Sequence, residues 1–436
     1  MPDARERSFL FLQGPHGPFF ARLGARLRES GARVVRVGFN AGDRAFWPDR
    51  ARYIPHREGP EAWPAHLAAL LDRHAITDIV LYGDTRPVHR MAIEAAAARG
   101  LTVHVFEEGY LRPWWITYER GGCNGNSRLM QWSLDDIRAR LEGHGGRLAP
   151  APDHWGDLRQ HVFYGALYHW FVMFLNRGYP GFQPHRTLGV RQEFSLYLRR
   201  LLMMPARRAA RFLHTRRLLR SGHPYHLALL QLDHDTSLRD HGPFREMGDF
   251  LELVIAGFAA GAPAHHHLAF KAHPLESGRL PLARRTREIA ARHGVGGRVH
   301  FIEGGKLGRL LDHAQSVVTV NSTAAHQALW RGLAVRAFGR AIYAKPELVS
   351  DQPIAEFFAA PRRPNPAAYA DFRRFLLATS QVPGGYYSAS GRRQLLRLLP
   401  DLLLAAQDPY DALRDGAQSG GRMTGAAQRQ QLRIVR

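Results

Sequence analysis

The chain has 436 residues, enough for two or three domains, and its 45% hydrophobic and 10% aromatic residues exclude a disordered protein. Its single cysteine, Cys123, excludes an internal disulfide framework and favours a reducing compartment. The formal net charge of +22 favours a polyanionic partner, namely nucleic acid, anionic lipid headgroups or a phosphorylated substrate, without choosing among them.

The first residues lack a signal-peptide pattern, and the longest apolar stretch, 162–175, is too short for a membrane span. We therefore expect a cytoplasmic protein. Over the first hundred residues, apolar runs typical of strands alternate with helical apolar spacing. Strands are predicted at 8–14, 31–40, 77–84 and 101–109, and helices at 19–30, 61–74 and 86–100. This alternation predicts a parallel, doubly wound sheet.

From about 155 to 222 the sequence is helical, aromatic and basic, and then the alternation resumes. Strands are predicted at 224–235, 266–274, 298–304, 316–322 and 333–339, and helices at 247–261, 284–294, 306–314 and 323–332. A short repeat, "HGPFF" at 16–20 and "HGPF" at 241–244, follows a glutamine-containing strand in each half. The chain therefore reads as two Rossmann-like halves separated by a helical insertion.

We predict four segments. Residues 1–154 form an N-terminal Rossmann-like domain, 155–222 the basic and aromatic insertion, and 223–408 a C-terminal Rossmann-like domain. Residues 409–436 lack periodicity and are expected to be a disordered basic tail.

Two adjacent carboxylates end the apolar run in "VHVFEEGYLRPWW" (103–115). Ligands of open α/β sheets bind at the carboxyl ends of strands, so this position suggests chemistry. Glu107 and Glu108 are candidates for a general base, because one carboxylate beside another has its pKa raised. The alternative is a solvated turn in which Arg112 pairs with one of them.

Two loops at strand ends are candidates for ligand contact. The glycines of "FLQGPHGPFF" (11–20) allow backbone to approach a ligand closely, or make only a tight turn. In "VVTVNSTAAHQAL" (317–329), Ser322 and Thr323 lie where a helix begins, so they either bind a phosphate or simply cap the helix.

A histidine ends the predicted strand in "FKAHPLE" (270–276), with Lys271 nearby. His273 there would suit a leaving phosphate, although most of the 24 histidines must be surface residues. No metal site is predicted, because "AHHHL" (264–268) lacks the spacing of a ligand set. No dinucleotide fingerprint, P-loop, nucleophile elbow or nucleic-acid motif is present.

These pieces together resemble a known family. "FLFLQGPHGPFFARLGARLRESGARVVRVGFNAGDRAFWP" closely resembles the N-terminus of bacterial capsule polysaccharide synthesis and export proteins of the KpsS/LipB type. "EEGYLRP", "LLQLDHDTSLRDHGPF", "KAHP" and "NSTAAHQAL" follow in the order of that family, so the resemblance extends over most of the chain but not the tail.

The resemblance implies a GT-B-like glycosyltransferase, with the two Rossmann-like domains facing a cleft. It implies transfer of the first β-Kdo from CMP-β-Kdo to lyso-phosphatidylglycerol with net retention, which starts the linker of a capsular polysaccharide. No cofactor or divalent metal is required, because the leaving group already carries its phosphate.

The resemblance also implies roles for single residues. Glu107 or Glu108 with Gly109 would supply the catalytic carboxylate, and His273 would assist departure of CMP. The nucleotide-side candidates are Lys271, His273, Pro274, Asn321, Ser322 and Thr323, and the acceptor-side candidates are Gln13, Gly14, Gly17, Gly109 and Arg112.

A phospholipid acceptor gives the insertion a use, because basic and aromatic helices can lie in an anionic headgroup layer. We therefore expect a peripheral protein on the inner face of the inner membrane, with other capsule proteins as possible partners; a buried hairpin with a solvated basic face is the alternative. Rival functions are a CDP-alcohol phosphotransferase of similar fold and a non-catalytic capsule-assembly scaffold. Nucleic-acid binding rests on charge alone and is not expected.

Overall fold

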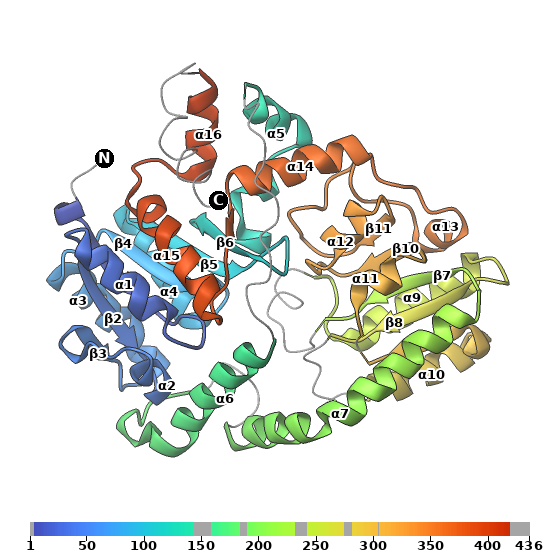
Figure 1. Ribbon diagram of the computed structural model, residues 1–436, viewed down its shortest axis with the longest axis horizontal. Coiled ribbons are helices and arrows are strands. Elements are labelled where there is room, and N and C mark those ends of the chain that lie inside the picture. Colours follow the sequence, from blue (N-terminus) through green and yellow to red (C-terminus); the bar gives the residue numbers. More distant parts are fainter. Residues whose placement is uncertain are drawn as a thin grey trace. The chain divides into compact units, whose positions relative to one another are not determined.

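The chain forms two compact α/β units, each described here by itself (Figure 1). Unit 1 comprises Met1–Phe194 and Asp371–Arg436, and unit 2 comprises Ser195–Ala370. The computed structural model describes residues 4–143, 158–183, 190–231, 242–273, 281–303 and 305–418.

A seven-stranded sheet with the order β12-β6-β5-β4-β1-β2-β3 forms the centre of unit 1. Its strands are β1 (Ser8–Phe11), β2 (Arg33–Gly38), β3 (Tyr53–Pro55), β4 (Asp78–Tyr82), β5 (Thr102–Glu108), β6 (Trp115–Arg120) and β12 (Gln381–Pro383). The first five are parallel, whereas β6 runs antiparallel to β5 and β12 runs antiparallel to β6. The carboxyl ends of β1 to β5 therefore share one edge.

Helices cover both faces of this sheet. The α-helices of unit 1 are α1 (Phe19–Glu29), α2 (Ala41–Ala45), α3 (Trp63–Arg73), α4 (Pro87–Arg99), α5 (Leu134–Leu141), α6 (Leu158–Leu175), α15 (Ala389–Leu404) and α16 (Pro409–Gln418). Successive strand residues point to opposite faces: Phe9 and Phe11 of β1 pack with α1 and α15, whereas Leu10 packs with α3 and α4. Figure 1 shows α15 (red) beside α1 (blue).

Unit 2 is built on a five-stranded, fully parallel sheet with the order β11-β10-β7-β8-β9. Its strands are β7 (Tyr225–Leu229), β8 (His267–Lys271), β9 (Val299–Ile302), β10 (Ala314–Thr319) and β11 (Ala334–Ala337). Its helices are α9 (Met247–Gly261), α10 (Leu282–Arg292), α11 (Leu307–Leu311), α12 (Ala325–Trp330) and α13 (Ile354–Ala359), while α7 (Val190–Arg220) and α14 (Pro366–Ala378) carry the chain between the units. The core of unit 2 lies between the sheet and α9, α10 and α13.

Short 3₁₀ helices complete the secondary structure of the described residues. They are η1 (Ala4–Glu6), η2 (Arg50–Arg52), η3 (Pro60–Ala62), η4 (Asn124–Asn126), η5 (Arg128–Gln131), η6 (Asn176–Gly178) and η7 (Gly296–Arg298).

The α/β fold class expected from the sequence is confirmed by two Rossmann-like units built on parallel strands, with two antiparallel strands added in unit 1. The segment 155–222, predicted as an insertion, is divided between the units, because unit 1 includes the residues up to Phe194 and unit 2 begins at Ser195. Along the chain, however, the second unit ends earlier than residue 408. Leu395, Leu399 and Leu403 of α15 belong to the same buried cluster as Phe9, so the C-terminal segment completes unit 1.

The prediction of a disordered tail from residue 409 is wrong for its first ten residues, which form α16. Tyr410 and Leu413 are buried, and Asp411 pairs with Arg128 at 2.9 Å. The remaining tail residues, 419–436, lie outside the described residues. Within the described part of the chain, no helix combines the length and apolar character needed to cross a membrane.

Candidate functional site

Glu107 and Glu108 are the last two residues of β5 and not part of a solvated turn. They pair with Thr117 and Ile116 of the antiparallel β6, and both side chains are half-buried. Successive strand residues alternate between faces, so the two carboxylates point to opposite sides of the sheet. The pair is therefore two separate acidic positions at one strand end.

The Glu108 carboxylate lies among tyrosines. Its Oε1 accepts hydrogen bonds from the hydroxyls of Tyr82, at 3.1 Å, and Tyr387, at 3.4 Å. The neighbouring Tyr386 donates to the Glu107 carbonyl at 2.8 Å. These three rings lie on the α1 and α15 face of the sheet, and they hold the end of β5 in place.

Glu107 has a carboxyl group whose pKa lies near neutral pH. Burial raises its pKa to about 7; the hydrogen bond from the Glu108 amide opposes this, and the charge of Glu108 adds to it. The expected effect of the neighbouring carboxylate is thus present, but desolvation is the larger cause. A pKa near working pH suits a group that exchanges protons.

Glu119 shows why a raised pKa alone does not define a site. Burial also raises its pKa to about 7. Its side chain, however, is only 1% exposed and accepts hydrogen bonds from the hydroxyls of Tyr110, at 2.6 Å, and Ser127. Glu119 is sealed in the core, whereas Glu107 is only half-buried.

Arg112 and Gly109 shape the turn after β5. Among the described residues no ion pair joins Arg112 to Glu107 or Glu108; its Nε donates instead to the Gly109 carbonyl at 3.2 Å. A Cβ atom at Gly109 would lie 2.1 Å from the carbonyl oxygen of Trp115, so the turn accepts only glycine.

The glycine loop after β1 is held by hydrogen bonds and close contacts with other segments of unit 1. Gln13, which is buried, donates to Asp43 at 3.2 Å and accepts from Arg86 at 3.4 Å. Gly17 has a φ of +121°, and a Cβ atom there would lie 3.2 Å from the Tyr164 ring of α6. The glycine therefore allows α6 to approach the loop closely.

Tyr168 anchors α6 at this loop. Its ring stacks on His16 with the centroids 4.2 Å apart, and its hydroxyl accepts a hydrogen bond from Asn40 at 2.7 Å. A small pocket beside it is lined by Gly14, Arg36 and Tyr168, among others. A Cβ atom at Gly14 would meet the Phe20 ring at 2.5 Å, so this position also requires glycine.

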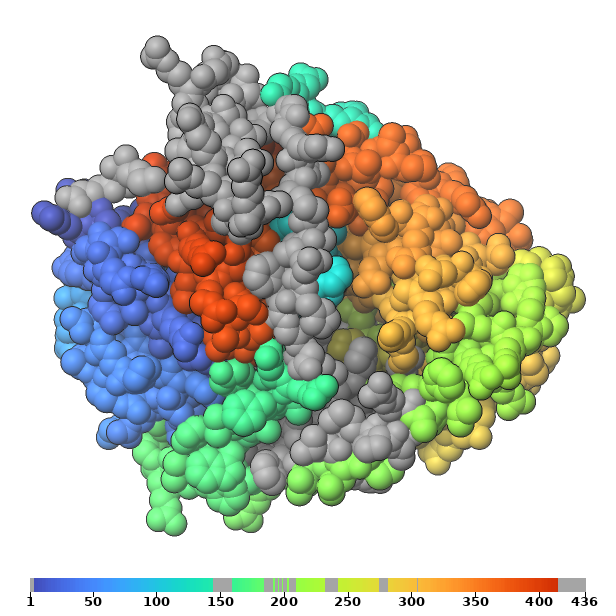
Figure 2. Space-filling model, viewed as in Figure 1, coloured from blue at the N-terminus to red at the C-terminus, as the bar shows by residue number. Residues whose placement is uncertain are grey.

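The same helix reaches the acidic strand end. His161 of α6 stacks on Tyr387 with the centroids 4.2 Å apart and the planes at 5°, and Tyr387 bonds Glu108. Figure 2 shows α6 (green) at the surface beside the N-terminal segment (blue). Glycine loop, α6 and acidic strand end thus form one continuous region of unit 1.

In unit 2, polar residues follow three adjacent strands, β10, β7 and β8. Asn321 follows β10 and exchanges two hydrogen bonds with Gln231, which follows β7, at 2.7 and 3.2 Å. Gln231 and Gln13 each lie two residues beyond the first strand of their sheet. The repeat at 241–244 is not tested, because His241 lies outside the described residues.

Ser322 and Thr323 precede α12, which begins at Ala325 and so later than expected. The Ser322 hydroxyl accepts a hydrogen bond from the Ala324 amide at 3.3 Å, and its carbonyl accepts one from Tyr343 at 2.8 Å. Thr323 is half-buried, and its carbonyl accepts a hydrogen bond from the His326 amide at 3.1 Å. The local turn therefore uses one of the two hydroxyls.

Lys271 is the last residue of β8, and its side chain is 6% exposed. Burial, together with the charge of Arg211, lowers its pKa to about 8, so the ammonium stays mostly charged at pH 7. His273 is half-buried two residues beyond the strand. Pro274 lies outside the described residues.

Sequence reasoning missed the aromatic part of the site. Tyr82, Tyr386 and Tyr387 surround the end of β5, and Tyr168 anchors α6, yet none was predicted. The only signal for two of them is the "GGYY" turn at 384–387, which is some 280 residues from Glu107 in the sequence.

Comparison with known proteins identifies the family. Residues 77–387 match the family described as "capsule polysaccharide biosynthesis protein". The chain belongs to this family. As a capsule polysaccharide biosynthesis protein, it carries the acidic strand end, the turn after β8 and the turn after β10 within the matched region.

Two curated relatives have similar length. The capsule polysaccharide export protein KpsS of Escherichia coli is 29% identical over 386 residues, covering 87% of this chain and 97% of that protein. The capsule polysaccharide modification protein LipB of Neisseria meningitidis serogroup A is 29% identical over 398 residues, covering 87% and 92%. The resemblance found in the sequence is thereby confirmed.

Solved structures show weaker likeness. The β-Kdo 2,7 transferase of Thermosulfurimonas dismutans KpsC has a TM-score of 0.45 and 12% identity, covering 91% of this chain and 100% of that one. Anabaena HepE in complex with UDP-glucose has a TM-score of 0.33 and 10% identity, covering 94% and 98%. The fold class of the present chain rests on its own two sheets.

Proposed function

We propose that this protein is a retaining glycosyltransferase that transfers the first β-Kdo residue from CMP-β-Kdo to lyso-phosphatidylglycerol. The observation that carries the proposal is Glu107, a half-buried carboxyl group at a strand end with its pKa raised to about 7. The donor and acceptor are those implied by the family resemblance. The product would start the linker of a capsular polysaccharide.

In this proposal unit 1 serves the acceptor. Glu107 accepts the proton of the acceptor hydroxyl as that hydroxyl attacks the sugar on the face that CMP leaves, which gives retention, because its pKa lies near working pH. Glu108 positions the strand end and does not take the proton, since its Oε1 already accepts bonds from Tyr82 and Tyr387. This assigns the two carboxylates different tasks.

Unit 2 would hold the nucleotide. The bond between the sugar and the CMP phosphate breaks with its electrons moving to the phosphate, so negative charge develops there. The Lys271 ammonium, the His273 side chain and the hydroxyls of Ser322 and Thr323 are the groups suited to that charge. Asn321 contributes by holding the turn through its paired bonds to Gln231.

The outer face of α6 supports a lipid acceptor. Phe163, Trp170 and Phe174 are 60%, 42% and 54% exposed, and they recur at intervals of seven and four residues, so they share one side of the helix. The opposite side, with Tyr168 and Val172, faces unit 1. An apolar stripe of this kind beside the acidic strand end fits the acyl region of a membrane surface.

A strongly basic helix follows in the sequence: the 31 residues of α7 include nine arginines and one glutamate. Such a helix attracts anionic headgroups at roughly 1 kcal/mol per basic residue near the surface. We therefore propose peripheral attachment to an anionic membrane.

The test is transfer of Kdo from CMP-β-Kdo, generated in situ, to fluorescent lyso-phosphatidylglycerol. Wild type is compared with Glu107→Gln, Glu108→Gln and His273→Ala, and Glu119→Gln serves as the matched control because it has the same raised pKa without access to the site. We expect product with wild type and Glu119→Gln, and a loss of at least about 100-fold with Glu107→Gln and His273→Ala.

Activity that survives in Glu107→Gln but disappears in Glu108→Gln would reverse the assignment of the two carboxylates. Wild type that is folded yet makes no product, with the donor shown to be present, would contradict the transferase and favour the capsule-assembly scaffold.

A further inference from the structure

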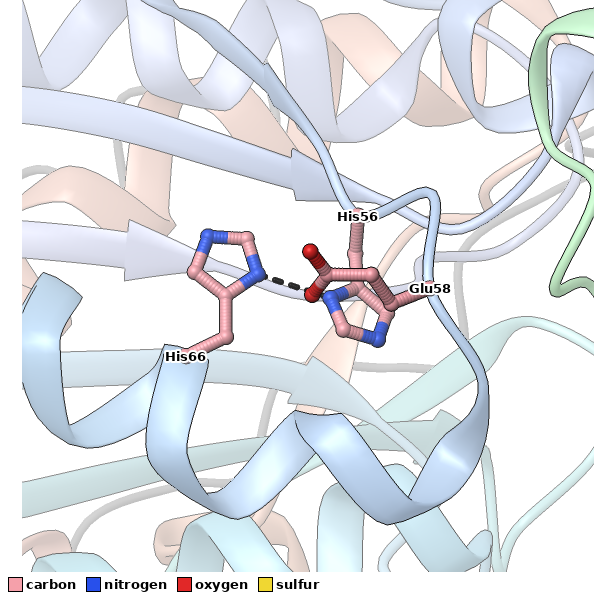
Figure 3. A group of neighbouring side chains, drawn as sticks. All are labelled: His56, Glu58 and His66. Carbon is pink, nitrogen blue, oxygen red and sulfur yellow. Dashed lines mark hydrogen bonds between the residues drawn. The ribbon is translucent and has the colours of Figure 1, made fainter.

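Three potential metal ligands meet beyond the carboxyl end of β3, away from the site described above. His56 directly follows β3, Glu58 lies in the next loop and His66 is on α3. Figure 3 shows the three side chains directed toward one another. Their ligand atoms all lie within 4.8 Å of one another, so one ion could contact all three.

The two imidazoles already face each other through the atoms that would bind a metal. The Nδ1 atoms of His56 and His66 are 2.7 Å apart, so one proton is shared between two lone pairs. A tetrahedral zinc ion with Zn–N bonds of about 2.0–2.1 Å would place two ligand nitrogens about 3.3 Å apart. Loss of that proton and a separation of about 0.6 Å would therefore admit the ion.

The second shell fits the same role. His56 Nε2 lies 3.3 Å from the Gly59 carbonyl oxygen, which accepts a hydrogen bond from an Nε2–H and leaves the lone pair of Nδ1 directed at His66. Histidines that bind metals usually donate their other ring N–H in this way. The His56 ring is also held edge-to-face by Phe39 and Trp63, at 5.6 and 5.3 Å.

Glu58 is the most exposed of the three residues, and it offers a carboxylate that can turn toward the ion. Two nitrogens and one oxygen leave a fourth tetrahedral position for water.

We propose that His56, Glu58 and His66 bind one divalent transition-metal ion, with zinc the best match to this donor set. The sequence spacing, H-x-E followed by seven residues and H, led to no such prediction. The ion would take two imidazole nitrogens and one carboxylate oxygen, and binding would release the proton now shared by the histidines.

The position argues for a structural ion and not a catalytic one. In the strand order, β3 is separated from β5 by β2, β1 and β4, which at about 4.8 Å per strand is about 19 Å. The loop it would fix supports the segment after α6: the Gly181 amide donates to the Arg57 carbonyl at 3.0 Å. A Cβ atom at Gly181 would lie 2.2 Å from the Glu58 carbonyl carbon, so the two segments are in direct contact.

The test uses the full chain freed of metal with a chelator. Zn²⁺ binding is measured by titration calorimetry and by elemental analysis after dialysis, and Co²⁺ absorption reports the geometry. We expect one ion per chain, tetrahedral Co²⁺ bands and a higher Tm with Zn²⁺. In His66→Ala the affinity should fall by more than about 100-fold, because even second-shell changes cost about 10- to 100-fold.

The matched control is His300→Ala. His267 and His300 also place two ring nitrogens 2.7 Å apart, in unit 2, without a third ligand group among the described residues. This variant should bind Zn²⁺ as the wild type does. Glu58→Gln, which changes an exposed side chain and leaves the core intact, should weaken binding. Wild type without a stoichiometric ion, or equal affinity in wild type, His66→Ala and Glu58→Gln, would overturn the proposal.

Discussion

Replacing Glu107 with glutamine should separate its proton chemistry from its structural role. Glutamine has the shape of the protonated acid but cannot ionise, so Glu107→Gln removes only the charge. Because burial raises the pKa from its usual 4.5 to about 7, the folded wild type holds this proton to higher pH than the unfolded chain does. Wild-type stability therefore falls as pH rises from about 4.5 through about 7.

The shift corresponds to about 3.4 kcal/mol in full, at 1.36 kcal/mol per pKa unit. Between pH 5.5 and 8.5 the same linkage gives about 2 kcal/mol, and screening at a half-buried side chain reduces this to about 1 kcal/mol. Urea unfolding at the two pH values should show Glu107→Gln gaining this amount over the wild type at the higher pH. Transfer by the wild type should rise with pH through about 7, since a base must be deprotonated.

An equal stability difference between Glu107→Gln and wild type at both pH values would contradict the raised pKa of Glu107. Transfer of sugar by Glu107→Gln at the wild-type rate would contradict its role as the base. Glu119→Gln provides the comparison. Like Glu107→Gln, it should gain stability over the wild type as pH rises, but its transfer rate should equal that of the wild type.

Three further outcomes are expected. Gly109→Ala should lower the free energy of unfolding, measured with urea, by about 1–3 kcal/mol, since its Cβ would lie 2.1 Å from a carbonyl oxygen. Unchanged stability would contradict this close approach. Trp170→Ala should reduce sedimentation with anionic vesicles, whereas Trp330→Ala, equally aromatic and 59% exposed on α12, should not. Asp78→Asn should cost about 3–5 kcal/mol by urea unfolding, because Arg7 and His104 both bond this buried carboxylate.

The regular part of the fold was predictable because its signals are local. Apolar runs followed by helical spacing mark β1, β2, β4, β5 and β7 to β11, and the predicted helices begin and end near a recognisable break, whereas the three-residue β3 was missed. The edge of the first sheet was not predictable. β12 has only three residues, Gln381–Pro383, and its pairing with β6 joins segments more than 260 residues apart.

The candidate site was likewise predictable where its signals are local and unpredictable where it depends on packing between distant segments. Glu107, Glu108, Lys271 and Asn321 were found because polar residues at the ends of apolar strands stand out in the sequence. The tyrosines around Glu108 come from two segments far apart in the sequence, Tyr82 and the turn with Tyr386 and Tyr387, so only tertiary packing brings them together. The raised pKa of Glu107 depends on burial, which no local pattern records.

The interruption of unit 1 by unit 2 has a consequence during synthesis on the ribosome. The apolar face containing Phe9 and Phe11 is covered by α15, which is translated only after the 176 residues of Ser195–Ala370. At about 5–20 residues per second this delay lasts roughly 9–35 seconds. The nascent N-terminal sheet, covered on this face only by α1, would expose the remaining hydrophobic surface for that time, which makes it a client for cellular chaperones until α15 emerges.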